Sequence, residues 1–576
     1  MKWIALAVLA LIAGVAGFIS VSLPPHPAPL PPGDATSRVR GAIHIHTQRS
    51  DGTGTIDGIA AAAARAGLQF IVITDHGDAT REPDAPVYRS GVLVIDAVEI
   101  STDGGHVVAL GLPKSPYPLA GDARDVVEDV ARLGGMSIAA HPGSDKPQLR
   151  WVEWAAPFNG IEWLNLDSEW RDERPAQLVR ALLTYPFRHV ETLGSVLDRP
   201  ETVLRRWDVL TGRRQVVALA AADAHARLSL RGDGDEYDSV GVLHVPAYEQ
   251  VFRAFSITVG PVAMTGDAAA DARTVVDAVR RGHVYSSIEA LAGPAAMTFT
   301  AARETVSTGT PSRRSFVRAA AGDVVPVGAG ELTLSLASNA PPGARIVLWK
   351  NGQAQPAVTG AAQTWTVPGR ERGVYRVELQ LAAAPGDAPV PWVLSNPIYV
   401  GDPAEATIAP RLPASEFASQ YENGFATDWT VETSPRSKAA LDVAPAVGGT
   451  QLSMRWALGG TRSESPYAAL VMPAGPALSG YDRLMFTARA TTPMRLSVQI
   501  RVPTGSQGER WQRSVFLDDT ARDIAVFFDE MTPKGATTER RPVLSNVRDV
   551  LFVVDTVNTK PGASGQIWID DVKYGR

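Results

Sequence analysis

The chain of 576 residues contains no cysteine. Disulfide bridges and thiolate metal ligands are therefore excluded, and the redox compartment has to be inferred from targeting signals alone. The sequence also lacks an excess of positive charge, because 55 lysines and arginines stand against 61 aspartates and glutamates and the net charge is −6. Proteins that bind a nucleic-acid backbone usually present a basic face, so no nucleic-acid partner is expected.

The remaining composition is that of ordinary globular domains, with 45% hydrophobic and 20% charged residues. It permits large cores, and the length indicates three or four domains in a multidomain chain. Histidine is scarce, with ten residues, and its placement carries the most information about function.

Three of these histidines lie between Arg40 and Asp78. Their β-prone neighbours predict that His44 and His46 lie two apart on one strand and project to the same side, as metal ligands do. Apolar residues at helical intervals predict a helix from Ile56 to Gly67, and the apolar run Phe70–Ile73 predicts a buried parallel strand. The stretch is expected to form a strand–helix–strand unit with polar side chains at strand ends, where α/β barrels keep their active sites.

Further histidines and carboxylates border other apolar, strand-like runs. A lone histidine at such a place is more often structural than a ligand, but the repetition argues against a chance arrangement. Imidazoles and carboxylates that converge from several strands can coordinate two or three divalent ions, and buried carboxylates need such compensation. The later residues of this kind are His76, Glu99, His106, His141, Asp223 and His225.

Taken together, six short motifs resemble the successive motifs of the PHP (polymerase and histidinol phosphatase) superfamily of metal-dependent hydrolases. The motifs are His44-Ile45-His46, Ser50-Asp51-Gly52, Thr74-Asp75-His76, Glu99, His141-Pro142 and Asp223-Ala224-His225. The resemblance implies a distorted (β/α)7 barrel over residues 37–302. It also implies a centre of two or three divalent ions, which are manganese, zinc or iron, at the C-terminal ends of the strands.

The same resemblance assigns the metal ligands. Glu99 is expected to bridge two ions. His106 lies where related proteins often carry a histidine, and it can bind either metal or substrate phosphate. The expected ligands are His44, His46, Asp51, His76, Glu99, His106, His141, Asp223 and His225.

The reaction expected from the resemblance is hydrolysis of a small-molecule ester, with a hydroxide shared by the metal ions as nucleophile. A phosphoester is favoured, because a multimetal site suits a phosphate whose oxygens can bridge ions. A bound phosphate is also expected to have an arginine nearby that donates charge-assisted hydrogen bonds. Arg171, Arg174 and Arg227 follow predicted strands and, with His106, are the candidates for substrate contact, although most such charged segments are solvated surface.

The N-terminal stretch is expected to be a targeting element, residues 1–23. Trp3 to Leu23 are 21 uncharged, mostly apolar positions behind Met1-Lys2. As a helix they can cross the about 30 Å of a bilayer core, so we expect a membrane anchor that places the rest outside the cytoplasm. A cleaved signal peptide, and hence secretion, is the alternative. Six prolines between Pro24 and Pro32 predict a stiff, extended spacer over residues 24–36.

After residue 302 the apolar period changes to two. Residues 303–402 are expected to form an Ig-like β-sandwich, with a hairpin at Asn351-Gly352. Its closing segment Pro391–Val400, after a PHP-like domain, resembles the carbaryl-hydrolase-like metallohydrolase group. This resemblance makes hydrolysis of a carbamate or carboxylic ester the runner-up reaction.

A linker is expected at residues 403–414, followed by a second sandwich over residues 415–576. The ending Gly565–Val572 is similar to the last strand of jelly-roll carbohydrate-binding modules. Trp429, Trp456, Trp511 and Trp568 can stack on sugars, although buried core positions are favoured for them. A non-catalytic protein that binds envelope glycan is therefore a second alternative function.

Overall fold

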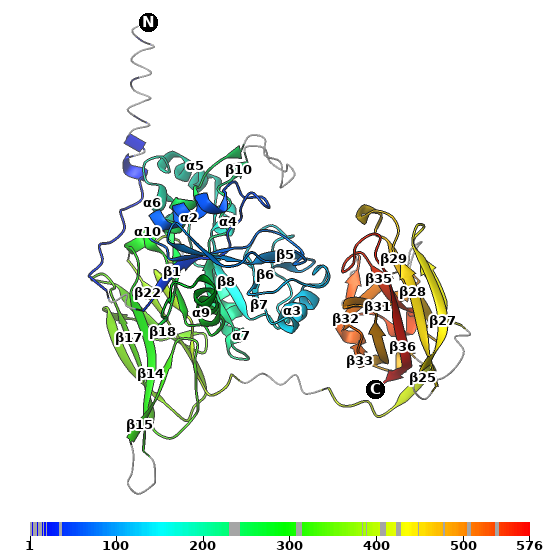
Figure 1. The fold of residues 1–576 in the computed structure, drawn as a ribbon. Helices are drawn as coiled ribbons and strands as arrows, with labels where there is room; N and C mark the ends of the chain where they lie inside the picture. The colour runs from blue at the N-terminus through cyan, green and yellow to red at the C-terminus, as the bar shows by residue number, and fades with distance from the viewer. Residues whose placement is uncertain are drawn as a thin grey trace. The chain divides into compact units, whose positions relative to one another are not determined.

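A computed structural model shows a chain of two compact units (Figure 1). Unit 1 comprises Met1–Asp78, Glu82–Pro113 and Asp122–Thr407, and unit 2 comprises Ala79–Arg81, Lys114–Gly121 and Ile408–Arg576. The structure describes residues 3, 9, 14, 17, 18 and 20, and then 21–33, 37–229, 242–306, 314–382, 384–386, 389–403, 411–421, 428–446, 449–475, 478–503, 509–535, 539 and 541–576.

The first strand–helix–strand unit forms as predicted. β1 (Val39–Ala42) pairs in parallel with β2 (Phe70–Ile73), and α2 (Ile56–Arg65) connects them. The Thr55 side chain caps α2 by accepting a hydrogen bond from Gly58 N, and the chain reverses through Gly67 at a φ of +74°. The Thr55 cap and the glycine at the end of the helix are local signals, and the sequence therefore predicts this helix.

Two groups of strands meet at their ends. β2 also pairs in parallel with β4 (Val92–Asp96). A second, five-stranded sheet has the order β5-β6-β7-β8-β9, with β5 (Val98–Thr102), β6 (Gly105–Leu110), β7 (Met136–Ala139), β8 (Gly160–Asn165) and β9 (Val217–Ala221). Parallel bridges join Ile45 to Ala224 and His76 to Glu99, so backbone pairing continues from β9 past β1 and β2 to β5. Side chains at these strand ends therefore converge.

Helices and short strands complete the first part of unit 1. The helices after α2 are α3 (Ala123–Arg132), α4 (Leu166–Arg171), α5 (Pro175–Thr184), α6 (His189–Gly194), α7 (Glu201–Thr211), α8 (Tyr248–Ala254), α9 (Ala268–Arg280) and α10 (Glu289–Ala292). The further strands are β3 (Val87–Arg89), β10 (Leu228–Ser229), β11 (Val242–Leu243), β12 (Ser256–Val259) and β13 (Val284–Ser287).

The segment predicted as an Ig-like sandwich has two sheets with an apolar core between them that includes Phe299, Leu334 and Trp392. One sheet has the order β15-β14-β17-β21. The other continues through β23 and β13 into β12, β1 and β2, because β13 pairs with β23. The boundary expected between residues 302 and 303 thus falls inside β14. The strands are β14 (Met297–Val306), β15 (Arg314–Ala320), β16 (Val324–Val325), β17 (Glu331–Ser338), β18 (Arg345–Lys350), β19 (Gln353–Ala354), β20 (Val358–Thr359), β21 (Ala362–Pro368), β22 (Gly373–Gln380), β23 (Val393–Ser395) and β24 (Ile398–Val400).

Unit 2 is a β-sandwich, as predicted for residues 415–576. One sheet has the order β27-β28-β36-β30-β33, with β25 also on β36, and the other has the order β26-β29-β35-β31-β32-β34. Inward-facing residues of both sheets form one core. The strands are β25 (Phe417–Tyr421), β26 (Thr430–Thr433), β27 (Lys438–Ala446), β28 (Gly449–Ala457), β29 (Tyr467–Pro473), β30 (Arg483–Ala490), β31 (Met494–Val502), β32 (Glu509–Leu517), β33 (Arg522–Phe527), β34 (Thr532–Lys534), β35 (Asp549–Asp555) and β36 (Ser564–Gly575).

The four tryptophans of this unit divide into two kinds. Trp429, Trp456 and Trp511 are buried in the core, as favoured from the sequence. Trp568 is half-buried, and the Arg489 guanidinium lies 3.7 Å from its ring centroid. Of the four, Trp568 is the most exposed.

Most of Trp3–Leu23 lies outside the described residues, as does most of the linker expected at residues 403–414. Within the part of the chain that the structure describes, no helix is both long and apolar enough to cross a membrane.

Candidate metal centre

The first histidine pair lies just beyond β1, not on a strand as predicted. β1 ends at Ala42, and His44 takes a φ of +67°, which interrupts the extended backbone. Ile45 then bridges to Ala224, and both histidine side chains are buried. His141 and Asp223 also have positive φ, of +29° and +44°. Such backbone costs about 1–3 kcal/mol per residue and is typical of functional sites.

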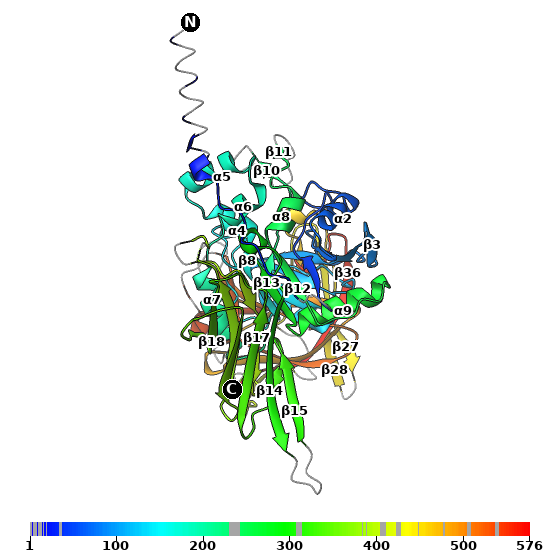
Figure 2. The same ribbon diagram turned by 90° about the vertical axis from the view of Figure 1, so that its left-hand side faces the viewer.

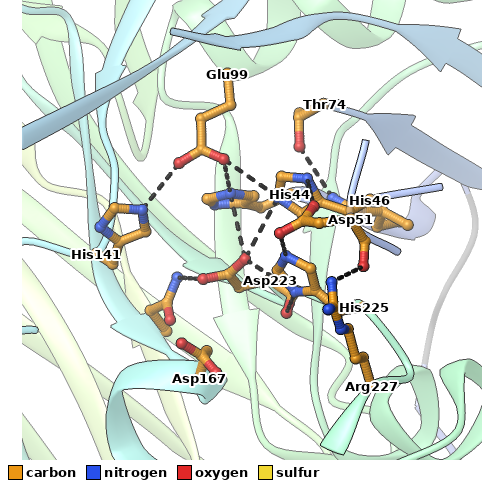
Figure 3. A network of polar contacts seen from close by, with 12 residues as sticks. His44, His46, Asp51, Thr74, Glu99, His141, Asp167, Asp223, His225 and Arg227 are labelled. Atoms are coloured by element: carbon orange, nitrogen blue, oxygen red, sulfur yellow. Dashed lines mark hydrogen bonds and ion pairs between the residues drawn. The ribbon is translucent and has the colours of Figure 1, made fainter. Parts of the chain in front are cut away.

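Glu99, near the start of β5, lies at the centre of the site (Figure 3). Its Oε2 atom lies 3.1 Å from His44 Nε2 and 3.2 Å from His46 Nε2. Asp223 Oδ1 lies 3.4 Å from the same His44 atom and 3.5 Å from the same His46 atom. Two imidazoles and two carboxylates therefore meet in one buried place.

The other oxygen of Glu99 serves a second group. Oε1 lies 2.9 Å from His141 Nε2 and 2.8 Å from His106 Nδ1. His141 lies two residues after the end of β7, whereas His106 is on β6, the partner of β5. Glu99 thus presents one oxygen to each group, which is the position expected of a bridging carboxylate.

Asp51 gathers a third group. Its Oδ2 atom lies 3.1 Å from His225 Nε2 and 3.7 Å from His76 Nε2, and its Oδ1 atom lies 3.3 Å from His46 Nδ1. The loop that carries Asp51 passes so close to His46 that a Cβ at Gly52 would lie 2.2 Å from His46 O. Glycine at this position therefore allows the close approach.

The structure brings all nine predicted ligands together. The groups whose ligand atoms lie within 4.8 Å of one another are His44, His46 and Asp223; His44, Glu99 and His141; His76, Glu99 and His106; and His46, Asp51, His76 and His225. The nine residues are separated by up to 181 positions in the chain and converge because the strand ends do.

Three of the histidines have a hydrogen-bond acceptor at Nδ1 and a carboxylate oxygen near Nε2. The Nδ1–H of His44 donates to Glu162 Oε1 at 2.6 Å, that of His141 to Leu149 O at 3.0 Å, and that of His225 to Asp223 O at 2.9 Å. Each Nε2 atom faces a carboxylate of the cluster. A neutral imidazole carries only one N–H, so each ring requires a second proton or a cation between its Nε2 atom and the carboxylate.

Charge in the cluster agrees with this requirement. Burial alone would lower the pKa of His44, but Asp223, Glu162 and Glu99 raise it well above its usual value. The pKa of His225 is raised to about 9 in the same way, against burial, by Asp51 and Asp223. Conversely, burial would raise the pKa of Glu99, yet the surrounding imidazoles hold it well below its usual range. The buried carboxylates therefore require compensating positive charge in the cluster.

Four polar atoms in the cluster are buried without a hydrogen-bond partner: His44 Nε2, His46 Nε2, Asp51 Oδ1 and His76 Nδ1. Each is a preferred donor atom for manganese, zinc or iron. Burying unsatisfied polar atoms costs about 1–3 kcal/mol each, so their convergence is what a metal centre requires. The residues present fit two or three divalent ions.

Glu162 and Asn165, on β8, are part of the site but are absent from the sequence prediction. Glu162 Oε2 accepts from His141 N at 2.8 Å and from Asn165 Nδ2 at 2.9 Å, and this amide also donates to Asp223 Oδ2 at 3.1 Å. The pairing of β8 with β9 shifts register between Glu162 and Leu164. Such an irregularity alters the strict alternation of side chains, so the sequence pattern does not show that two residues three apart meet on one face.

The three arginines predicted to contact substrate occupy different positions. Arg227 Nη1 donates to Asp51 O at 3.4 Å, beside the cluster (Figure 3). Arg171 pairs with Asp167 on α4, and Arg174 is exposed just before α5. Of the three, Arg227 is the one placed at the cluster by a hydrogen bond to one of its residues.

Comparisons with known proteins leave the family open. No family model matches the chain, and no curated protein matches it. Similar solved structures include a family 11 carbohydrate-binding module from Clostridium thermocellum in complex with a mixed-linked tetrasaccharide, at 14% identity over 27% of this chain and 94% of that one, with a TM-score of 0.24. A carbohydrate-binding module of the β-sandwich superfamily matches at 13% identity over 47% and 96% of the chains, with a TM-score of 0.21.

A family 30 carbohydrate-binding module from a cellulosomal cellulase of Clostridium thermocellum matches at 8% identity over 27% and 96% of the chains, also with a TM-score of 0.21. The TM-scores of all three structures are below 0.5. These likenesses are therefore too weak to assign a function to this chain.

Proposed function

We propose that this protein is a metal-dependent hydrolase of the PHP type. A phosphoesterase is the favoured activity. The observation that carries the proposal is the convergence of nine imidazole and carboxylate side chains, four of whose atoms are buried without a hydrogen-bond partner. The continuous pairing from β9 past β1 and β2 to β5 supports a distorted barrel as its scaffold.

His44, His46, Glu99 and Asp223 would hold one ion. Glu99 with His106 and His141 would hold a second, and Asp51, His76 and His225 a third. Divalent ions bound there supply Lewis acidity, since they lower the pKa of water and offset negative charge on ester oxygens.

The side chains around the ligands prepare the site. Glu162 fixes the tautomer of His44, because a carboxylate can only accept and the Nδ1 atom must therefore carry the proton. Asp75 accepts hydrogen bonds from Thr47 N and Ser50 Oγ, both at 2.7 Å, and so holds the loop that presents Asp51. These contacts place the ligands before any ion arrives.

The position of Arg227 beside the cluster favours a phosphoester substrate. Its guanidinium lies beside Asp51, where it can donate charge-assisted hydrogen bonds to a phosphate oxygen. A neutral carbamate or carboxylic ester has no such requirement and remains the alternative substrate class. The half-buried Trp568 side chain is the feature that fits the other alternative, glycan binding through unit 2.

Metal content tests the centre. Protein purified without chelator should contain two or three equivalents of manganese, zinc or iron per chain by elemental analysis. Less than one equivalent, with no uptake on titration, would contradict the proposed function.

A substrate panel tests the reaction. We expect hydrolysis of p-nitrophenyl phosphate or its bis-ester, and the Arg227→Ala variant should lose about tenfold to a hundredfold in kcat/KM on these substrates, the value of a hydrogen bond to a charged group. Arg171→Ala, which removes an arginine paired on the helix surface, is the matched control and should retain activity. Turnover of only p-nitrophenyl acetate or a naphthyl carbamate, unaffected by Arg227→Ala, would reject the phosphoesterase and keep the hydrolase.

A further inference from the structure

Helix α5 (Pro175–Thr184) presents its apolar residues to solvent. Val179 and Leu182 are 55% and 52% exposed, and Leu183 is 36% exposed. Phe187, in the turn after the helix, is 62% exposed. The helix rests on unit 1 through other side chains, among them the buried Ala181 and Thr184.

The exposed residues form one face of the helix. Val179, Leu182 and Leu183 are spaced by three and four positions, which places them side by side on a helix. Single exposed apolar residues are normal, but a contiguous group on one helix face marks an interaction site. The exposed face of α5 is therefore a candidate interaction surface.

The end of the N-terminal apolar stretch is fixed against the same helix. Arg180, on α5, donates from Nε to Ser22 O at 2.9 Å, and the Arg188 guanidinium donates to Pro24 O. Ser22 and Pro24 are both buried. Figures 1 and 2 both draw this part of the chain next to α5. The C-terminal end of the mostly apolar stretch, at Ser22 and Leu23, therefore lies against the helix that carries the exposed apolar face.

The spacer after this point is held as well. His26 Nδ1 lies 3.1 Å from Glu191 Oε1, and Ala28 N donates to Leu291 O at 2.9 Å. Because both ends of the short segment are attached to unit 1, a bilayer that received Trp3–Leu23 would come to lie at α5.

We propose that the exposed face of α5 lies in the interface of the membrane that receives Trp3–Leu23. The helix is about 15 Å long, and amphipathic helices of this kind lie in the membrane plane with the apolar side among the acyl chains. Pro175–Arg188 contains no acidic residue and includes Arg180 and Arg188, and this positive charge suits phosphate head groups. The inference is independent of the hydrolase proposal.

The absence of cysteine provides a direct test. Single-cysteine variants Leu182→Cys and Phe187→Cys of the full chain are labelled with an environment-sensitive fluorophore and reconstituted in vesicles of phosphatidylcholine and phosphatidylglycerol. Val209→Cys, at a position 57% exposed on α7, is the matched control. Figures 1 and 2 both draw α7 away from α5 in unit 1.

If the inference holds, a spin label on the lipid acyl chains quenches the fluorophores at residues 182 and 187 several-fold more than the fluorophore at 209, and aqueous iodide does the reverse. Equal quenching by iodide at all three positions would overturn the proposal. Protection from both quenchers at residues 182 and 187 would also overturn it, because a second copy or another protein would then cover the face.

Discussion

Unit 1 contains two buried polar networks that differ in how their charges are satisfied. In the first, Arg199 donates two hydrogen bonds to Glu378, at 2.6 and 2.9 Å. Arg376 donates to Glu378 at 2.5 Å and twice to Asp208, at 2.9 and 3.0 Å. Trp349 lies against both guanidinium groups, with centroid distances of 5.0 and 4.4 Å. Every carboxylate there has a permanent cation fixed against it.

The second network is the cluster around Glu99. Its carboxylates face imidazoles, which are cationic only when doubly protonated, and four of its atoms lack a hydrogen-bond partner. His44, His141 and Asp223 also have positive φ, whereas Glu378, Arg376 and Arg199 do not. The first network is complete without a ligand, and the second is complete only with added positive charge. Burial of charge alone therefore does not identify a functional site, but convergent unsatisfied atoms do.

The largest expected effect comes from breaking the unsatisfied network. The double variant His44→Ala and Asp223→Ala should lose hydrolysis by at least about 10⁴-fold, or about 5.4 kcal/mol, because the Lewis acid is no longer held. Elemental analysis should show less metal than in the unaltered protein. His283→Ala removes a histidine paired with Asp323 at 2.8 Å outside the cluster and is the control. An equal loss in both variants would contradict the assignment.

Breaking the complete network should affect stability and leave metal binding unchanged. Glu378→Gln leaves Arg199 and Arg376 buried with too little negative charge, which should cost about 3–5 kcal/mol of unfolding free energy in denaturant titration of unit 1. Glu249→Gln, which removes partly exposed pairs with Arg65 and Arg253, should cost at most about 1 kcal/mol. Metal loss in folded Glu378→Gln protein would show that the two networks are coupled.

A smaller effect is expected where a hydrogen-bonding residue supports the cluster. Glu162 accepts at both oxygens, from His44, His141 and Asn165. Glutamine has one acceptor oxygen, so its amide would face a donor. Glu162→Gln should weaken metal binding about tenfold to a hundredfold in competition with a chelator.

The matched control for this variant is Glu153→Gln, which changes a half-buried carboxylate to the same amide and should bind metal as the unaltered protein does. Unfolding of the metal-free proteins separates the possible causes. If Glu162→Gln destabilises the metal-free protein but binds metal normally, Glu162 has only a structural role.

The smallest effect should come from Glu289, a buried carboxylate whose partners are two hydroxyl groups and a more distant arginine. It accepts from Ser256 and Ser287 hydroxyls at 2.5 and 2.8 Å, and Arg40 Nε lies 3.7 Å away. Burial raises the pKa of Glu289 above its usual value, despite Arg40. The folded state then holds the proton more tightly than the unfolded state, so its stabilising contribution is full below the unfolded pKa and is lost as pH rises through the folded one.

Glu289→Gln removes this titration. Its unfolding free energy should therefore fall less than that of the unaltered protein as pH rises from about 4 through the neutral range. Parallel curves for the two proteins would show that Arg40 keeps Glu289 ionised in the folded state.

Local features agree between sequence and structure because their causes lie within a few residues. Thr55 and Gly67 delimit α2, and Asn351-Gly352, with φ of +51° and +75°, turns β18 into β19 as predicted. Such caps and turns depend on backbone preferences of the residues themselves. Eight of the nine candidate ligands border an apolar run, and the ninth, Asp51, lies in a polar loop and is expected from the family resemblance alone.

Other features depend on segments distant in the chain. Glu378 and Arg199 meet across 179 positions, and no local pattern marks either residue. Glu162 and Asn165 reach the site together through a shift in strand register. The sheet that joins β13 to β23 crosses the expected domain boundary, because strand pairing does not follow the change of period in the sequence.

The sequence by itself determined the local elements and the ligand types, since period, caps and residue chemistry are properties of short segments. Only the tertiary structure decided which charges meet and which face of α5 remains in solvent. The spacing of Val179, Leu182 and Leu183 predicts an apolar stripe but not the direction in which it points. That direction depends on packing of the opposite face, through Ala181 and Thr184, against residues from elsewhere in unit 1.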